Sequence, residues 1–209
     1  MIRCTSLGEY HLKLVVSASG SKAGVGFLVS TQLFARSPLE VKVVVPGRIL
    51  ELQSKILYVS NCPSLKFAVF HGSNVLEDRQ VFEEKLTPYL LDATVLMGDF
   101  NAITRLPDTN IVSAKSLLWP WLVDADGSCK LVDITRLACN RSLPPTRVRS
   151  YGNTRSYLDW IYVSHLLLRW VNGLHFLSFR FRKLNGKDFS NHNPVSVSIN
   201  VWASRVKEQ

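Results

Sequence analysis

The sequence predicts an α+β fold built mainly of antiparallel β-strands, and three observations support this. Short β-prone segments separated by turns fill residues 10–70, with connections too short for parallel crossovers. One amphipathic helical pattern follows at residues 75–91. The chain has 209 residues, 46% of them apolar, which is enough for one domain with a sizeable core. We therefore predict a single domain over residues 1–209.

The first half of the chain is predicted to be a meander of short strands that leads into the helix. Turn residues such as Pro46 and Gly47 separate successive strands. The predicted strands are residues 10–17, 24–30, 41–45, 48–53, 55–59 and 65–70. Asn74, with Glu77 three residues later, gives the capping pattern of the helix, and Pro88 is expected to strain the helix near its end.

The second half is predicted to alternate between strands and short helices. Strands are expected at residues 94–97, 157–163, 174–181 and 195–202, a helix at 114–123, and a helical turn at 165–170. Trp119 and Trp121 are expected in the core. No apolar run approaches the roughly 20 residues of a membrane span. The four cysteines show no Cys-x-x-Cys spacing, so we expect reduced thiols in an intracellular protein.

The net charge of +9 is concentrated in one part of the chain. Between Ile134 and Ser190 the basic residues are Arg136, Arg141, Arg147, Arg149, Arg155, Arg169, Arg180, Arg182, Lys183 and Lys187, opposed by Asp159 and Asp188. Two interpretations fit this excess: a polyanionic partner, or a soluble protein with a solvated basic face. The excess favours nucleic acid over a membrane, because no basic amphipathic helix is evident.

Two polar side chains follow the short apolar run that ends at Met97. Gly98 ends the run, and Asp99 and Asn101 come next with Phe100 between them. Residues two apart in an extended backbone point the same way, so a carboxylate and a carboxamide are offered together at the carboxyl end of a strand. Ligands bind at such ends in layered α/β proteins. The alternative is an Asx-rich turn that simply leaves a core strand.

Several motifs stand in a fixed order along the chain. They are Gly24 to Leu28 (GVGFL), Gly98 to Asn101 (GDFN), Thr146, Ser156 to Ile161 (SYLDWI), and Ser190 to Val195 (SNHNPV). This order resembles the endonuclease/exonuclease/phosphatase superfamily, and most closely the endonuclease domains of non-LTR (LINE-type) retrotransposons, over residues 24–201. The resemblance implies a four-layer α/β/β/α sandwich, with two packed, mainly antiparallel sheets flanked by helices, and with its leading strands shortened.

The resemblance also implies hydrolysis of phosphodiester bonds in DNA rather than RNA, in the nucleus, with Mg²⁺ or Mn²⁺. Asp99 matches the aspartate that orients or deprotonates the attacking water, and Asn101 the asparagine that hydrogen-bonds the scissile phosphate. His192 matches a histidine on that phosphate, and Asp159 the carboxylate paired with it. Each residue has a structural alternative: Asp159 as a strand-edge ion pair, and His192 as a satisfied histidine before a strand.

Further residues are assigned to DNA in the same way. Thr146 matches a threonine that positions DNA in the retrotransposon branch, and Ser190 stands at the serine of the family's Ser-Asp-His motif. Arg147, Arg149 and Arg155 belong to the basic excess and are expected to contact nucleic acid.

The sequence departs from the family pattern at the expected metal site. Asn191 replaces the family aspartate, which removes a charge beside the metal. Glu9 is the candidate for the family's metal-binding glutamate, with a turn glutamate as the alternative. The family's phosphate-contacting tyrosine aligns with Phe70 or His71. A weakened or inactive nuclease is therefore expected, and the alternative is a non-catalytic nucleic-acid-binding or protein-interaction module. A shortened sheet would expose an edge, to be covered by residues 10–17 or by a homodimer.

Overall fold

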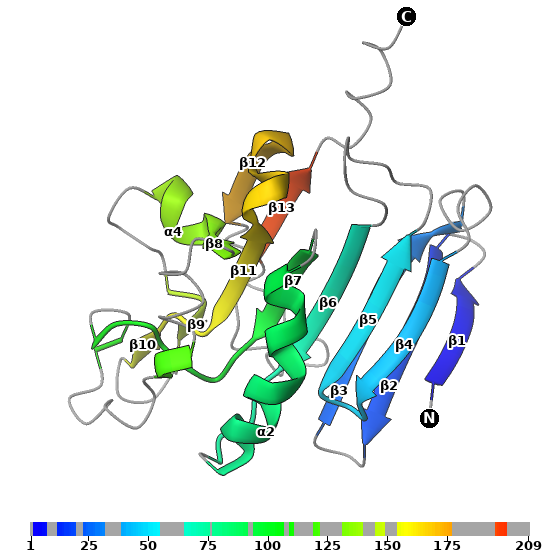
Figure 1. The fold of residues 1–209 in the computed structure, drawn as a ribbon, viewed down its shortest axis with the longest axis horizontal. Coiled ribbons are helices and arrows are strands. Elements are labelled where there is room, and N and C mark those ends of the chain that lie inside the picture. The colour runs from blue at the N-terminus through cyan, green and yellow to red at the C-terminus, as the bar shows by residue number, and fades with distance from the viewer. Residues whose placement is uncertain are drawn as a thin grey trace, which may run out of the picture.

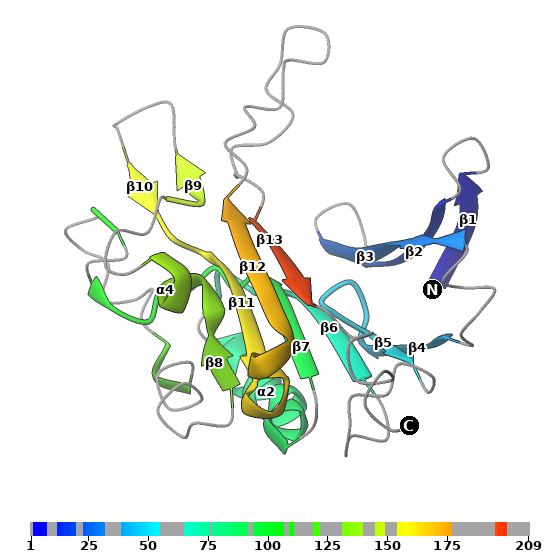
Figure 2. The ribbon, with the colours of Figure 1, turned by 90° about the horizontal axis from the view of Figure 1, so that it is seen from above.

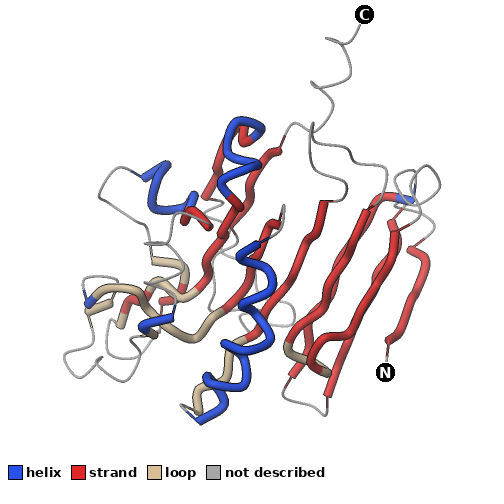
Figure 3. Tube along the Cα trace, in the orientation of Figure 1, coloured by secondary structure: helices blue, strands red, loops and turns tan. Residues whose placement is uncertain are grey.

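The computed structural model describes residues 2–7, 12–19, 23–31, 39–54, 65–75, 77–91, 94–106, 109–110, 119–121, 131–139, 145–148, 154–176 and 195–199. The strands are β1 (Ile2–Leu7), β2 (Leu12–Ser19), β3 (Ala23–Ser30), β4 (Leu39–Val45), β5 (Ile49–Ser54), β6 (Leu65–His71), β7 (Thr94–Asp99), β8 (Leu131–Asp133), β9 (Arg147–Val148), β10 (Arg155–Ser156), β11 (Asp159–Ser164), β12 (Val171–Phe176) and β13 (Val195–Ile199). The helices are α2 (Glu77–Leu86), the 3-10 helix η2 (Thr87–Leu91), α4 (Ile134–Cys139) and the 3-10 helix η5 (His165–Trp170). Strands predominate, as Figures 1 and 3 show.

A six-stranded sheet in the order β4-β5-β6-β7-β11-β8 forms the centre of the structure. Its strands pair antiparallel except β6 and β7, which run parallel. A parallel pair needs a crossover connection, and α2 with η2 provides it between these two strands. Because β6 and β7 run in the same direction, their carboxyl ends lie side by side at one end of the sheet.

The two faces of this sheet are covered by different elements. On one face, Phe82 and Leu86 of α2 pack with Phe70 and Leu96 of the sheet. On the other face lie the three-stranded sheet β1-β2-β3 and the pair β12-β13. Alternate residues of the central strands point to each face. Figure 2 shows this arrangement as a helix layer, the central sheet and a second β layer.

The second β layer is packed on the central sheet through apolar side chains. Val15 and Val25 pack with Leu50 of β5. From β13, Val197 and Ile199 pack against the cluster that contains Val95 and Ile161. The predicted α+β fold with two packed β layers is thereby confirmed.

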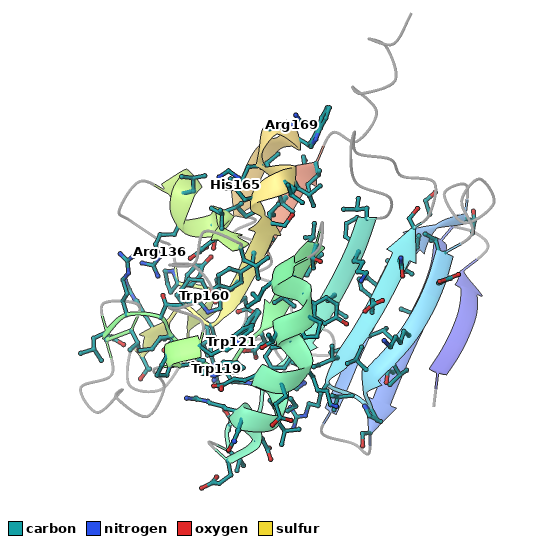
Figure 4. All side chains as sticks on the ribbon, viewed as in Figure 1. Trp119, Trp121, Arg136, Trp160, His165 and Arg169 are labelled. Atoms are coloured by element: carbon teal, nitrogen blue, oxygen red, sulfur yellow. The ribbon has the colours of Figure 1, made fainter. Side chains whose placement is uncertain are left out.

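Aromatic residues fill the core beneath α2. Trp119 is fully buried and lies 5.6 Å from Trp121 between ring centroids, so the prediction that both tryptophans pack in the core is confirmed (Figure 4). The indole of Trp119 donates a hydrogen bond of 2.6 Å to Glu83 Oε1. Arg79 stacks over the same ring, 5.8 Å from its centroid. Burial lowers the pKa of Arg79, and the neighbouring Glu83 partly offsets this effect.

Most predicted elements within the described residues are present with shifted ends. The helix is α-helical over Glu77–Leu86 and becomes 3-10 through Pro88, which cannot continue an α-helix. Strand β12 begins at Val171, earlier than predicted. Five of the described elements were not predicted: β1, β8, α4, β9 and β10. Residues 55–59, 177–181, 200–202 and most of 114–123 lie outside the described residues.

None of the described helices is long and apolar enough to cross a membrane.

The three-stranded sheet has β1 and β3 at its edges, and the central sheet has β4 and β8. The single domain over residues 1–209 and the homodimer through a sheet edge both stay predictions.

Candidate active site

The last residue but one of β7 is a glycine that no other residue could replace without strain. Gly98 has a φ of +141°, a conformation that residues with a Cβ rarely adopt. A Cβ built on it would lie 1.9 Å from the carbonyl oxygen of Phe70 on β6. The local sequence therefore brings β6 and β7 into very close contact directly before Asp99.

Asp99 and Asp159 face each other across neighbouring strands. They are register partners in the antiparallel pair β7–β11, and both side chains are half-buried. Residues 97 and 161, two positions inward on each strand, pack toward the second β layer. By strand alternation both aspartates project from that same face. Two carboxylates therefore lie side by side at one end of the central sheet. The sequence predicted this position for Asp99, but it did not predict that Asp159 would be its partner on the neighbouring strand.

Asn101 is held beside Asp99 in a left-handed conformation. Its φ is +48°, which asparagine tolerates better than most residues, and its side chain is only 5% exposed. Its backbone N–H donates to Asp99 Oδ1 at 2.8 Å, and its Nδ2 donates to the carbonyl oxygen of Gly72 at 2.9 Å. The first bond is the Asx turn that the sequence offered as the alternative interpretation. This turn places the carboxamide of Asn101 next to the carboxylate of Asp99. The Asx turn and the pair of polar side chains at the strand end are therefore one arrangement.

Thr146 holds the start of β11 in place through two hydrogen bonds. The side chain is fully buried, and its hydroxyl oxygen accepts hydrogen bonds from the backbone N–H groups of Leu158, at 3.0 Å, and Asp159, at 3.1 Å. The described contacts of Thr146 are therefore internal, and they fix the backbone that carries Asp159. Its assignment to DNA stays a prediction.

Two further residues lie at this end of the sheet, and the sequence offered only the first of them, as one of two alternatives for the phosphate-contacting position. His71 is the register partner of Asp99 in the parallel pair β6–β7. Phe70, its neighbour, is buried in the aromatic core 4.9 Å from the ring of Phe100, so alternation turns His71 toward the face of Asp99. Of the two alternatives for the phosphate-contacting position, only His71 is on the side of the aspartates.

Arg48 is the second of these residues. It is the last residue of the turn between β4 and β5, and its Nη1 donates to the carbonyl oxygens of His71, at 3.3 Å, and Gly72, at 3.0 Å. The alignment with the family's phosphate-contacting tyrosine was the available signal for His71, and it left Phe70 as the alternative. No periodic pattern in the sequence points to Arg48, because its contacts are to backbone atoms of a distant strand.

The predicted arginines are placed only in part. Arg155 is exposed on β10, where its backbone N–H donates to Asn110 Oδ1 at 2.7 Å and its carbonyl accepts from Thr109 Oγ1 at 3.0 Å. Arg147 on β9 is half-buried, and its Nε is buried with no hydrogen-bond partner within the described segments. Arg149 lies outside the described residues.

Glu9, Ser190, Asn191 and His192 also lie outside the described residues, so their predicted roles stay predictions. The strand ends that flank Glu9 pair with each other as Leu7 and Leu12. Ser17, at the other end of β2, accepts a hydrogen bond of 3.0 Å from the N–H of Gly47, next to Arg48. The described part of the chain contains no group of three or more His, Cys, Asp or Glu residues that could hold a metal ion.

Comparisons with solved structures agree with this architecture. The chain is similar to an AP endonuclease from Archaeoglobus fulgidus, with a TM-score of 0.69 and 14% identity, over 91% of this chain and 80% of that one. It is similar to the endonuclease domain of TRAS1, a telomere-specific non-LTR retrotransposon, with a TM-score of 0.60 and 13% identity, over 89% and 80%. It is also similar to the 3′ phosphatase NExo from Neisseria, solved with a product DNA hairpin, with a TM-score of 0.62 and 16% identity, over 90% and 79%.

At these identities the structural likeness shows the fold alone. A comparison with curated proteins gave no match. The family model of the Endonuclease/Exonuclease/phosphatase family matches residues 7–192, which include the segments that carry Asp99, Asn101 and Asp159. The chain therefore belongs to the Endonuclease/Exonuclease/phosphatase family.

Proposed function

We propose that this protein is a Mg²⁺-dependent DNA endonuclease of the non-LTR retrotransposon type, which hydrolyses phosphodiester bonds. The observation that carries the proposal is the direct pairing of Asp99 with Asp159 at the end of the sheet where Asn101 is also held. Carboxylates and an amide at one strand end are the groups that water activation and phosphate binding need. A nuclear location, where its substrate is found, goes with this proposal.

Each residue has a role in the proposed reaction. Asp99 orients the attacking water and accepts its proton. Asn101 donates a side-chain N–H to the scissile phosphate, since only one of its two amide protons is needed for the bond to Gly72. Asp159 orients His192, so that the N–H of its imidazole stabilises the negative charge that develops on the phosphorus-bound oxygens.

The chemistry of the donor set fits a divalent cation. Mg²⁺ prefers hard oxygen ligands and is commonly bound by one or two carboxylates, with water and substrate phosphate completing its shell. Glu9 and Asn191 would hold the ion. Asp99 and Asp159, both half-buried, are the described carboxylates at this end of the sheet. When bound, the ion supplies Lewis acidity to the phosphate oxygens.

The basic residues beside this end of the sheet suit a DNA backbone. Arg155 is exposed on the short ribbon β9–β10, which leads through Leu158 directly into Asp159. Arg147 and Arg149 lie on the same segment of the chain. We expect these arginines to contact phosphates on either side of the cleaved bond, which gives binding that weakens as salt is raised.

A nicking assay on supercoiled plasmid with Mg²⁺ or Mn²⁺ tests the proposal. Asp99→Asn, which removes the charge and keeps the shape, is expected to lower the nicking rate by about 10²-fold or more. Glu84→Gln, the same chemical change at an exposed position of α2, is the matched control and is expected to leave the rate unchanged.

Three outcomes would contradict the proposal. Equal rates for wild type and Asp99→Asn would separate the activity from this site. Salt-dependent DNA binding without nicking in either metal would instead identify a non-catalytic nucleic-acid-binding module. Cleavage confined to duplexes that carry an abasic site would place the protein with the AP endonucleases rather than the retrotransposon type.

A further inference from the structure

Arg48 connects the turn between β4 and β5 to the end of β6. Its backbone N–H closes the turn on the carbonyl of Val45 at 3.0 Å, and its own carbonyl accepts the N–H of His71 at 2.9 Å. Its guanidinium then reaches the carbonyl oxygens of His71 and Gly72. Arg48 makes no ion pair within the described part of the chain. The two backbone carbonyls are therefore the partners of its guanidinium among the described residues.

The carbonyl oxygen of Gly72 is shared between Arg48 and Asn101. Arg48 Nη1 donates to it at 3.0 Å, and Asn101 Nδ2 donates to it at 2.9 Å. A carbonyl oxygen has two lone pairs, so both are used. Gly72 itself is fixed, because its N–H donates to the carbonyl of Asp99 at 2.7 Å and a Cβ on it would lie 2.1 Å from the carbonyl oxygen of Phe100.

This shared acceptor decides which way the carboxamide of Asn101 faces. A carboxamide can turn over and exchange its oxygen for its NH₂ group at little steric cost. The Gly72 oxygen accepts hydrogen bonds only, so it selects the orientation in which Nδ2 points to it. The cationic donor of Arg48 holds that oxygen in place, since bonds to charged donors are stronger than bonds between neutral groups.

We propose that Arg48 is a positioning residue for Asn101, acting through the carbonyl oxygen of Gly72. The proposal rests on the proposed function, in which Asn101 contacts the scissile phosphate. Arg48 does not itself touch the substrate in the proposed reaction. Its removal leaves the Gly72 carbonyl oxygen with one donor, so that this oxygen and the carboxamide of Asn101 bonded to it are held less narrowly.

A double-mutant cycle on the nicking reaction tests the coupling. Arg48→Gln is expected to lower kcat about tenfold with little change in KM, because an orienting contact acts on the transition state more than on substrate binding. In an Asn101→Ala background the same substitution is expected to cause no further loss, since there is no carboxamide left to orient. Arg48→Lys, which keeps a cationic donor, is expected to retain more activity than Arg48→Gln.

Lys42→Gln is the matched control, because it removes a basic side chain from an exposed position of the same hairpin. It is expected to leave both kcat and KM unchanged. An equal loss from Arg48→Gln in the wild-type and Asn101→Ala backgrounds would overturn the proposal. An Arg48→Lys variant no better than Arg48→Gln would also overturn it.

A second measurement does not depend on activity. The side-chain ¹H–¹⁵N resonances of Asn101 can be assigned by their loss in Asn101→Ala. Arg48→Gln is expected to shift these resonances beyond any change seen in Lys42→Gln, while thermal unfolding shows that both variants are folded. Unchanged Asn101 resonances would refute positioning by Arg48. If wild type nicks no DNA but the resonances shift, the proposed function fails and the positioning of Asn101 by Arg48 stands.

Discussion

Two regions of the molecule are held in place in different ways. The first is the end of the central sheet that carries Asp99, Asn101 and Asp159, called the active end because of the proposed function, and the second is the three-stranded sheet β1-β2-β3. At the active end, hydrogen bonds between separate segments hold the backbone: Gly72 N–H donates to the Asp99 carbonyl at 2.7 Å, and Phe100 N–H donates to the Leu158 carbonyl at 2.9 Å. The three-stranded sheet is held mainly by apolar packing of Val15 and Val25 on the central sheet. Directional bonds fix positions more narrowly than apolar burial does. The active end should therefore tolerate far less change.

The largest expected difference between the two regions is at glycines. Gly98→Ala is expected to destabilise the protein by about 3 kcal/mol or more, because its φ and its contact with the Phe70 carbonyl both exclude a Cβ. Gly24→Ala on β3 is the matched control, since its Cβ would meet nothing nearer than 3.9 Å, and a change of less than about 0.5 kcal/mol is expected. Urea unfolding measures both. Similar losses of unfolding free energy in Gly98→Ala and Gly24→Ala would show that the two regions tolerate a Cβ equally well.

A smaller loss is expected at Thr146, which has only hydrogen bonds to lose. Thr146→Val keeps the shape but leaves the N–H groups of Leu158 and Asp159 without their acceptor, at a cost of about 2 kcal/mol. Nicking should fall as well, because the backbone of Asp159 is released. Thr146→Ser keeps the hydroxyl and is expected to restore both properties. If Thr146→Val cleaves DNA at the wild-type rate, Thr146 does not position Asp159.

The smallest effect is expected where the two regions meet. Ser17→Ala removes the acceptor of the buried Gly47 N–H and is expected to cost about 1 kcal/mol of unfolding free energy. The nicking rate should change by less than twofold, because Arg48 and Gly72 keep their own bonds. Ser19→Ala, at an exposed position of the same strand, is the control. A large loss of nicking in Ser17→Ala would show that the three-stranded sheet also orients the active end.

The sequence predicted strand β7 and the place of Asp99 at its end better than the elements around them. Asp99 was singled out because it follows a clear apolar run, and Asp159 because it stands within an ordered motif; their roles stay predictions. Strand β8 (LVD) is too short to show a period, and the polar alternation of β1 (IRCTSL) resembles a loop, so neither was predicted. The role of Arg48 could not be predicted from the sequence. It depends on which backbone carbonyls the fold brings near its guanidinium.

The pairing of Asp99 with Asp159 joins strands from distant parts of the chain, β7 at Thr94–Asp99 and β11 at Asp159–Ser164. During folding, contacts between residues so far apart in sequence carry a loop-closure penalty and form late. A refolding chain can bury much of α2 and β4–β7 before β11 arrives, and in that state it has only one of its two carboxylates in place. Recovery of catalysis after dilution from denaturant would then lag behind recovery of helix signal, and the length of that lag would time the docking of β11.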